Sequence, residues 1–430
     1  MIRSKPYVVL GFLWFLSPPT FSTSSSSYEI GVEHIMSSVM TSSKEIESFK
    51  KLLLADDDLV ASEKKYFYPK VNLTSTYNDY YGDISPPTDK DFDIRVELLM
   101  TLYSDTTSDK ISAAENNRLS SGYNLKQKVN EIYFSIVGSL ISIERSRIFL
   151  QDAKLIEIQL KNYIARVSES VNQGISPQSY LRETELVKVR FDNIITTVES
   201  NIDRYFKDLS LATGYKIKDS AKVGVNPDFL KAVLQNKIEF DPSLPARNNF
   251  GLLAKYHQVQ GLHDSADAQL EKMKLTFFNN TDSGLISTET NINRGLRNTS
   301  VMGLRFQYQL FDYQQIKNQS SSYNSYYSEL ALLDYEKENI YLQALQLKDN
   351  YFTLVKKRSN LLEQVKLSKE LVAAQEREIL LGRIDFIDIV KSLPELIRTD
   401  VTLLDNDLDL YNTITDYKRL VSIRFDYEGL

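Results

Sequence analysis

The sequence contains no cysteine among its 430 residues. Disulfide bonds, a thiolate nucleophile, cysteine-ligated zinc and lipid attachment to an N-terminal cysteine are therefore excluded. The chain also lacks a basic excess, because its formal net charge is −6. Nucleic-acid binders carry a basic stripe, so we expect no nucleic-acid partner.

The groups that usually build catalytic or metal sites are scarce. The three histidines are His34, His257 and His263, and the last two are six residues apart, which does not place them on one helix face at ligand spacing. There is no phosphate-binding loop of the GxxxxGK[ST] type. The acidic run at 56–58 is interpreted as a solvated helix face. We expect no enzymatic activity, no cofactor and no metal.

Long hydrophobic runs are also missing, except near the N-terminus. Arg3 and Lys5 precede an apolar run over 6–16, and a Ser/Thr-rich tract follows it. This pattern predicts a signal peptide over 1–27, and the alternative is the start of a buried helix. No later stretch reaches the ~18 apolar residues of a membrane-spanning helix. Any insertion of the mature chain into a membrane would therefore be through strands.

Glycine and proline are few, 15 and 11 respectively, and they are clustered, so long helical patterns run uninterrupted between them. Two such patterns meet at Gly174, and two more meet at Gly382, which is 208 residues later. The same offset relates Tyr103 to Phe311, each at the end of an alternating segment. Two landmarks with one offset indicate an internal repeat.

The repeat divides the mature chain into three parts. We predict a first repeat over 28–213, an irregular connector over 214–247 and a second repeat over 248–425. Each repeat has the order helix, hairpin, very long helix, turn, helix. The expected helices cover 28–66, 106–173, 175–212, 248–272, 313–381 and 383–425, with a short one at 229–236 in the connector. The expected strands cover 71–77, 92–102, 275–277 and 302–310, with polar loops over 79–91 and 279–300.

The strands alternate between apolar and polar residues, as in Val71, Leu73 and Tyr77 against Asn72 and Thr74. Such strands suit a transmembrane barrel, but four of them cannot close one, because the smallest bacterial barrels have about eight. A soluble sheet that caps a helical bundle is the alternative. The long helices favour the first interpretation: about 68 residues span roughly 100 Å, which is too long for a compact domain and is typical of a coiled coil or a tunnel wall.

These features together resemble the TolC family of outer-membrane efflux and secretion channels, over nearly the whole mature chain. No single motif is specific, and the duplicated order of elements with equal helix spacing carries the resemblance. The resembling segments are 61–73 with Pro69-Lys70-Val71-Asn72-Leu73, Gln173-Gly174-Ile175-Ser176, Leu310-Phe311-Asp312, Leu381-Gly382 and Ile387-Asp388-Ile389-Val390.

The resemblance implies an α+β membrane protein with two structural repeats. Each chain would contribute four strands to a 12-stranded trimeric β-barrel, and its antiparallel coiled-coil helices would form a periplasmic tunnel. The protein would lie in the bacterial outer membrane, in contact with its lipid, and would export proteins or small molecules. Its partners would be a periplasmic adaptor and an inner-membrane ABC or proton-driven transporter, as in type I secretion or multidrug efflux. The alternative function is a non-pore coiled-coil scaffold of the cell envelope.

The resemblance also assigns residues at the tip of the tunnel. Asp388 and Tyr180 occupy the positions of pore-lining aspartates, Lys391 occupies a further pore-lining position, and Glu376 matches a position that holds the tip closed. Three copies of Asp388 would form a carboxylate ring, which Lys391 would partly neutralise, giving a less cation-selective constriction. The alternative role for Asp388 is a solvated acid favoured by a helix start. The turns expected to dock the adaptor contain Gln173, Gly174, Ile175, Leu381, Gly382 and Arg383.

Overall fold

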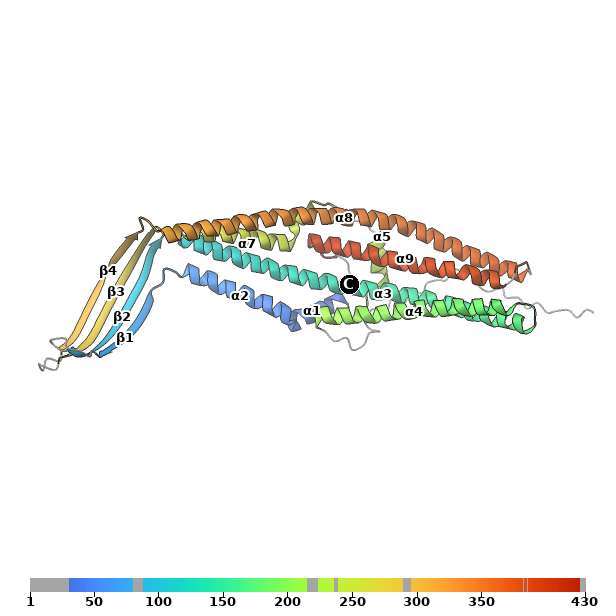
Figure 1. Ribbon diagram of the computed structural model, residues 1–430, viewed down its shortest axis with the longest axis horizontal. Helices are drawn as coiled ribbons and strands as arrows, with labels where there is room; N and C mark the ends of the chain where they lie inside the picture. Colours follow the sequence, from blue (N-terminus) through green and yellow to red (C-terminus); the bar gives the residue numbers. More distant parts are fainter. Residues whose placement is uncertain are drawn as a thin grey trace, which may run out of the picture.

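The computed structural model describes residues 31–79, 88–214, 223–235, 239–288, 295–381, 383–384 and 386–425. The predicted signal peptide and the turn glycine Gly382 lie outside these ranges. Four long helices run along the molecule. A sheet lies at one end, and the two turns that connect the helices in pairs lie at the other (Figure 1). The long helices are α3 (Thr107–Asn172), α4 (Gln178–Thr213), α8 (Tyr313–Leu380) and α9 (Phe386–Val421).

These helices form because almost nothing in their sequences interrupts them. The 66 residues of α3 include no proline, and at a rise of about 1.5 Å per residue the helix is roughly 100 Å long. The predicted length and position of α3 and α8 are thus reproduced within two residues. None of the described helices combines the length and apolar character required to cross a bilayer.

The sheet is antiparallel, with its strands in sequence order, so β1 and β4 form its two edges. The strands are β1 (Lys70–Asp79), β2 (Thr88–Ser104), β3 (Met273–Thr288) and β4 (Gly295–Tyr308). The register aligns Leu73, Val96, Thr281 and Ser300 in one row across the sheet.

The polar loop predicted over 279–300 is wrong, because most of it belongs to β3 and β4. Residues from Asn279 to Ser283 are polar on both faces of the strand, so hydropathy does not alternate along them. The backbone ladder between β3 and β4 forms regardless of side-chain polarity. The strands of the first hairpin are also longer than predicted. The loop expected over 79–91 is therefore shorter, because β1 ends at Asp79 and β2 begins at Thr88.

The short helices also depart from the prediction in places. The single helix expected over 28–66 is two, α1 (Val32–Ser42) and α2 (Lys44–Lys64), and the Ser43 hydroxyl between them accepts a hydrogen bond from the Ile46 amide. This N-cap starts a new helix where no glycine or proline marks a break. The second repeat begins with α7 (Phe250–Asp267), and the connector contains α5 (Pro227–Gln235) and α6 (Leu244–Asn248).

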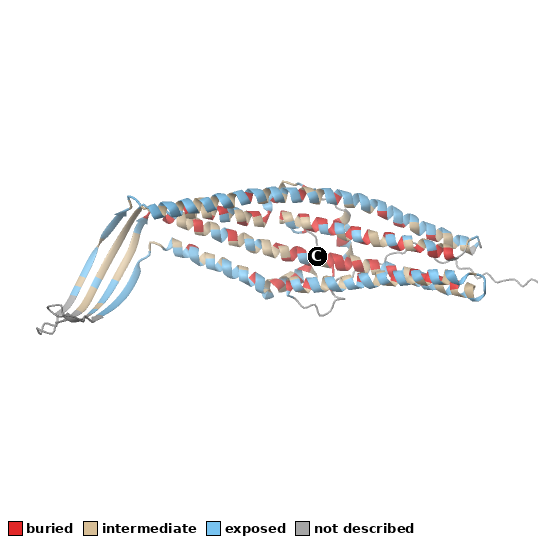
Figure 2. Ribbon diagram, viewed as in Figure 1, coloured by how far each residue is buried: buried red, intermediate tan, exposed pale blue. Residues whose placement is uncertain are grey.

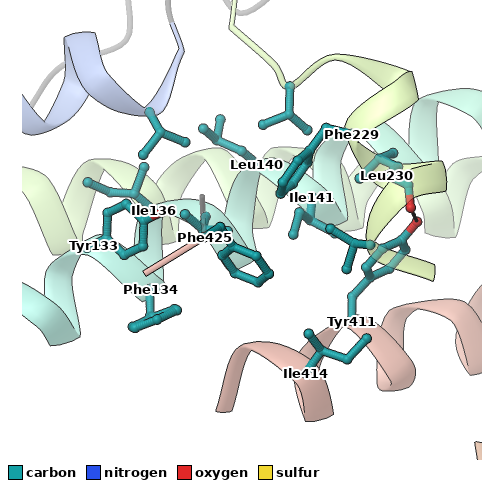
Figure 3. Close-up of a cluster of buried hydrophobic side chains, with 14 of the residues drawn as sticks. Tyr133, Phe134, Ile136, Leu140, Ile141, Phe229, Leu230, Tyr411, Ile414 and Phe425 are labelled. Carbon is teal, nitrogen blue, oxygen red and sulfur yellow. Dashed lines mark hydrogen bonds between the residues drawn. The ribbon is translucent and has the colours of Figure 1, made fainter. Parts of the chain in front are cut away.

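The apolar core is divided along the long axis rather than gathered in one place (Figure 2). Around the middle of the molecule, the connector packs against α3 and α9 (Figure 3). There the Tyr411 hydroxyl of α9 donates a hydrogen bond to the Leu230 carbonyl of α5, 3.0 Å away. A second cluster joins α3, α4, α8 and α9 towards the helical tip.

One buried carboxylate ties three long helices together between these clusters. Asp407 of α9 is 2 % exposed, and its two oxygens lie 2.9 Å from the Arg145 Nε of α3 and 2.7 Å from the Arg358 Nε of α8. Two charge-assisted hydrogen bonds compensate for the cost of burying this carboxylate. The link fixes the position of α9 against the longest helix of each repeat.

Candidate functional site at the helical tip

The two turns that join the long helices lie together at the end of the molecule opposite the sheet (Figure 1). In the first turn Gly174 has a φ of 71°, a backbone conformation that glycine adopts without a Cβ clash. The amide of Gly174 donates to the Val171 carbonyl, and the amide of Ile175 donates to the Ser170 carbonyl, each at 2.9 Å. These two bonds are those of a Schellman helix end.

The second turn repeats part of this geometry at the same sequence offset. The Arg383 amide donates to the Glu378 carbonyl at 3.0 Å, 208 residues after the equivalent bond between Ile175 and Ser170. Each turn also exposes a large apolar side chain, Ile175 at 73 % and Leu381 at 65 %. The turns are thus alike in backbone geometry and in presenting apolar groups to solvent.

Glu376, predicted to hold the tip closed, accepts a hydrogen bond from a tyrosine that is not among the predicted site residues. The Tyr163 hydroxyl of α3 donates a hydrogen bond to Oε1 of Glu376 in α8. Tyr163 is 5 % exposed, and burial raises the pKa of its phenol, with the hydrogen bond and charge of Glu376 raising it further. Tyr163 therefore stays protonated and remains a donor across the physiological pH range.

Two of the other predicted residues are brought together across a different pair of helices. The Lys391 Nζ of α9 lies 5.9 Å from the centre of the Tyr180 ring in α4, a cation–π contact. Both links join one helix of the first repeat to one helix of the second. The hairpin α3–α4 and the hairpin α8–α9 are therefore held together at the tip by polar contacts as well as by apolar packing.

Asp388 lies on an open groove of about 670 Å³ between α8 and α9, which Lys391, Gln375 and Glu378 also line. On this groove, the Ser392 hydroxyl is 2.6 Å from Oε1 of Gln375 and 2.8 Å from the Asp388 carbonyl oxygen. The structure thus places Asp388, Lys391 and Tyr180 in one neighbourhood. Glu376, by contrast, is held against α3.

The sequence carried a signal for Tyr163 that composition alone does not reveal. Leu160, Tyr163 and Val167 are buried at spacings of three and four, so Tyr163 belongs to the packed seam of α3. A tyrosine in such a seam needs a partner for its hydroxyl, and the partner here is 213 residues away. Gln375 and Ser392 gave no comparable signal.

The chemistry available at this tip is that of charge and hydrogen bonding between two helical hairpins. Across the described ranges, no group of three or more histidine, aspartate or glutamate side chains is arranged to hold a metal ion. The tip instead combines titratable groups, two inter-hairpin links and exposed apolar turns. Such an arrangement can hold the two hairpins together.

Comparison with known proteins identifies the fold. No protein-family model matches the sequence, and no curated protein matches it. Among solved structures, the channel protein CusC superposes with a TM-score of 0.77 at 12 % identity, covering 90 % of this chain and 91 % of that one. The outer-membrane protein VceC of Vibrio cholerae gives 0.74 at 9 % identity, covering 92 % and 97 %. The open state of the MtrE outer-membrane channel of Neisseria gonorrhoeae gives 0.71 at 10 % identity, covering 91 % and 89 %.

Over about nine-tenths of its length, the chain therefore has the fold of these outer-membrane channel proteins. More particularly, the fold is that of the TolC type, with a four-stranded sheet at one end and two long helical hairpins. The predicted resemblance to the TolC family is confirmed at the level of fold, and the neighbours are channels rather than enzymes.

Proposed function

We propose that this chain is the protomer of a trimeric export channel in the bacterial outer membrane. Its strands form a 12-stranded barrel with two further copies, and its helices form a periplasmic tunnel. A periplasmic adaptor and an inner-membrane ABC or proton-driven transporter complete the pathway. Substrate is a protein or a small molecule, as in type I secretion or multidrug efflux.

The observation that carries the proposal is the exposed apolar face of the sheet. Leu73 of β1 is 72 % exposed, and Leu304 and Phe306 of β4 are 65 % and 61 % exposed. The opposite face carries an ion pair, 2.7 Å between the Arg95 Nε and an Asp282 oxygen. An apolar outer face with a polar inner face is the arrangement of a strand that separates lipid from an aqueous lumen.

The edges of the sheet make assembly necessary if that face meets lipid. The edge strands β1 and β4 each pair on one side, and an open edge leaves backbone groups unsatisfied in hydrocarbon. Pairing β4 of one copy with β1 of the next satisfies both edges. The resemblance to the TolC type supports three copies.

The adaptor has two adjoining grooves between α4 and α9 in which to dock. One of about 220 Å³ is apolar at Phe191 and Ile397 and is flanked by Arg190 and Arg398. The next, of about 650 Å³, includes Asp405. An amphipathic helical segment fits such a surface, because it supplies an apolar stripe and charged flanks. Of the turn residues expected to dock the adaptor, Gln173, Gly174, Ile175, Leu381 and Arg383 lie at the tip end of the same helix pair.

Single-channel recording in a planar bilayer tests the proposal, together with the mass of the detergent-solubilised particle. Three copies per particle and discrete conductance steps are the expected results. A folded trimer that conducts neither as the full chain nor with both tip turns deleted would overturn the channel. That result would favour the non-pore scaffold, as would extraction from the envelope without detergent.

A further inference from the structure

Three lysines from three separate elements surround one tyrosine ring where the sheet meets the helices. Lys70 of β1, Lys110 of α3 and Lys274 of β3 place their Nζ atoms 5.8, 5.5 and 5.6 Å from the centre of the Tyr66 ring. Each distance is within cation–π range. We call these four residues the Tyr66 cluster.

The cluster is held in place by hydrogen bonds. Nζ of Lys274 lies 2.9 Å from the Tyr66 hydroxyl and 3.4 Å from a Glu271 oxygen, and Ser104 donates to the other Glu271 oxygen at 2.6 Å. Burial would raise the pKa of the Glu271 carboxyl, but the Ser104 hydrogen bond and the ammonium groups of Lys274 and Lys110 outweigh it and keep the pKa below its usual value.

The cluster carries more positive than negative charge. In the part of the chain that the structure describes, Glu271 is the one carboxylate in an ion pair with any of the three lysines. All three nitrogens lie within 5.8 Å of one ring centre, so no two are more than about 11 Å apart. At low ionic strength the screening length is ~30 Å, well beyond this separation, so the ammonium groups repel one another. A bound anion with several charges would remove this repulsion.

The face of the sheet on which the cluster lies indicates whether it is turned towards the lumen or towards lipid. Lys70 and Lys274 alternate with apolar residues of β1 and β3, and they share the face that carries the Arg95–Asp282 ion pair. In the proposed trimer this is the lumen side, at the junction of barrel and tunnel. A dissolved anion reaches the cluster there, whereas a lipid headgroup meets the opposite face.

We infer that the Tyr66 cluster binds a phosphate-type anion, and that three copies form an anion-attracting ring where the tunnel opens into the barrel. Compact phosphate groups suit lysine, which acts as a point charge with three donors. The position of the ring in a duct depends on the proposed function. Anion binding by the cluster itself does not.

Calorimetric titration of the full-length protein in neutral detergent with inorganic pyrophosphate, at low salt, tests the inference. The variant is Lys70→Gln combined with Lys110→Gln, because within the described ranges these two side chains contact the ring alone, whereas Lys274 also bonds the Tyr66 hydroxyl and Glu271. We expect pyrophosphate to bind at least about tenfold more weakly to this variant. Lys70→Arg with Lys110→Arg keeps the charge and should retain most of the affinity.

Lys317 provides a matched control, since its Nζ lies 5.4 Å from the single ring of Tyr313 without a second lysine. Lys317→Gln should leave the affinity unchanged. Equal affinity in the wild type and the double glutamine variant would overturn the inference, as would an equal loss in Lys317→Gln. Binding confined to micelles containing phosphatidylglycerol, with none to pyrophosphate, would overturn it too. The channel proposal is tested by conductance, so its outcome is independent of the result of this titration.

Discussion

Tyr163 of α3 donates its hydroxyl hydrogen to Glu376 of α8, so one hydrogen bond joins the two repeats near the tip. A hydrogen bond to a charged acceptor contributes about 1.5–3 kcal/mol. In the proposed channel this bond favours the closed arrangement of the hairpins. Its loss therefore changes gating rather than folding.

Tyr163→Phe should raise the ratio of open to closed time by about tenfold or more, since the ring keeps its packing and the bond is lost. Glu376→Gln retains an acceptor oxygen and should have a smaller effect. Single-channel recordings of both variants provide the measurement. An unchanged open probability in Tyr163→Phe would show that the bond has no part in closure.

Asp388 and Lys391 line the same groove and should influence ion selectivity in opposite directions. Asp388→Asn removes a carboxylate from each copy, so the preference for cations should fall. Lys391→Gln removes the neutralising charge, so that preference should increase. Reversal potentials in a salt gradient report both changes. If neither variant shifts the reversal potential, the carboxylate ring is excluded while the channel is retained.

Asp407→Asn should lower the free energy of unfolding by about 3 kcal/mol, because Arg145 and Arg358 lose the buried charge that compensates them. Asp409→Asn, at an exposed site on the same helix, should change it by less than about 0.5 kcal/mol. Denaturant titration of the helical circular dichroism signal provides both values. Equal effects at the two sites would contradict a structural role for the three-helix link.

Asp400 should make stability depend on pH. Burial raises the pKa of its carboxyl above the ordinary 3.8, with Asp152 adding to the effect and Lys369 and Arg145 opposing it. The folded state therefore holds the proton more tightly than the unfolded state does. The resulting stabilisation is complete below pH 3.8 and is lost as the pH rises through the raised pKa. Asp400→Asn should therefore gain stability relative to wild type between pH 4 and pH 7, as measured by thermal unfolding, and a constant difference would contradict this.

Two glycine-to-alanine substitutions should have opposite signs. At Gly174 the positive φ imposes backbone strain on alanine, which should cost about 1–2 kcal/mol although the space for a Cβ is open. At Gly138, inside α3, a Cβ also meets nothing within 4 Å, and the higher helix propensity should stabilise by about 1 kcal/mol. Measuring the unfolding free energies of both variants against the wild type tests these two signs. A destabilised Gly138→Ala would reveal a close neighbour at that site in the assembled protein.

The long helices could be predicted because rare glycines and prolines delimit them, and the repeat could be predicted because Gly174 and Gly382 share an offset with a strand end. The strand segments around Asn279 could not be predicted, because polar residues on both faces of the strand leave no alternating hydropathy pattern. The break between α1 and α2 could not be predicted either, because it depends on the Ser43 hydroxyl capping α2. Serine occurs at many positions where no helix ends or begins. At the tip, the resemblance pointed to Glu376, but neither the resemblance nor periodicity identified Tyr163 as its partner, because seam positions on different helices meet according to packing rather than sequence distance.

The unpaired edges of β1 and β4 also have a genetic consequence. In the proposed ring every copy contributes β1 to one intersubunit seam and β4 to the next. One copy with a defective edge strand therefore prevents the whole ring from closing. A cell that makes normal and defective chains in equal amounts would assemble only about one intact ring in eight. Alleles that damage these two strands should therefore behave as dominant, whereas alleles that prevent the chain from folding at all should be recessive.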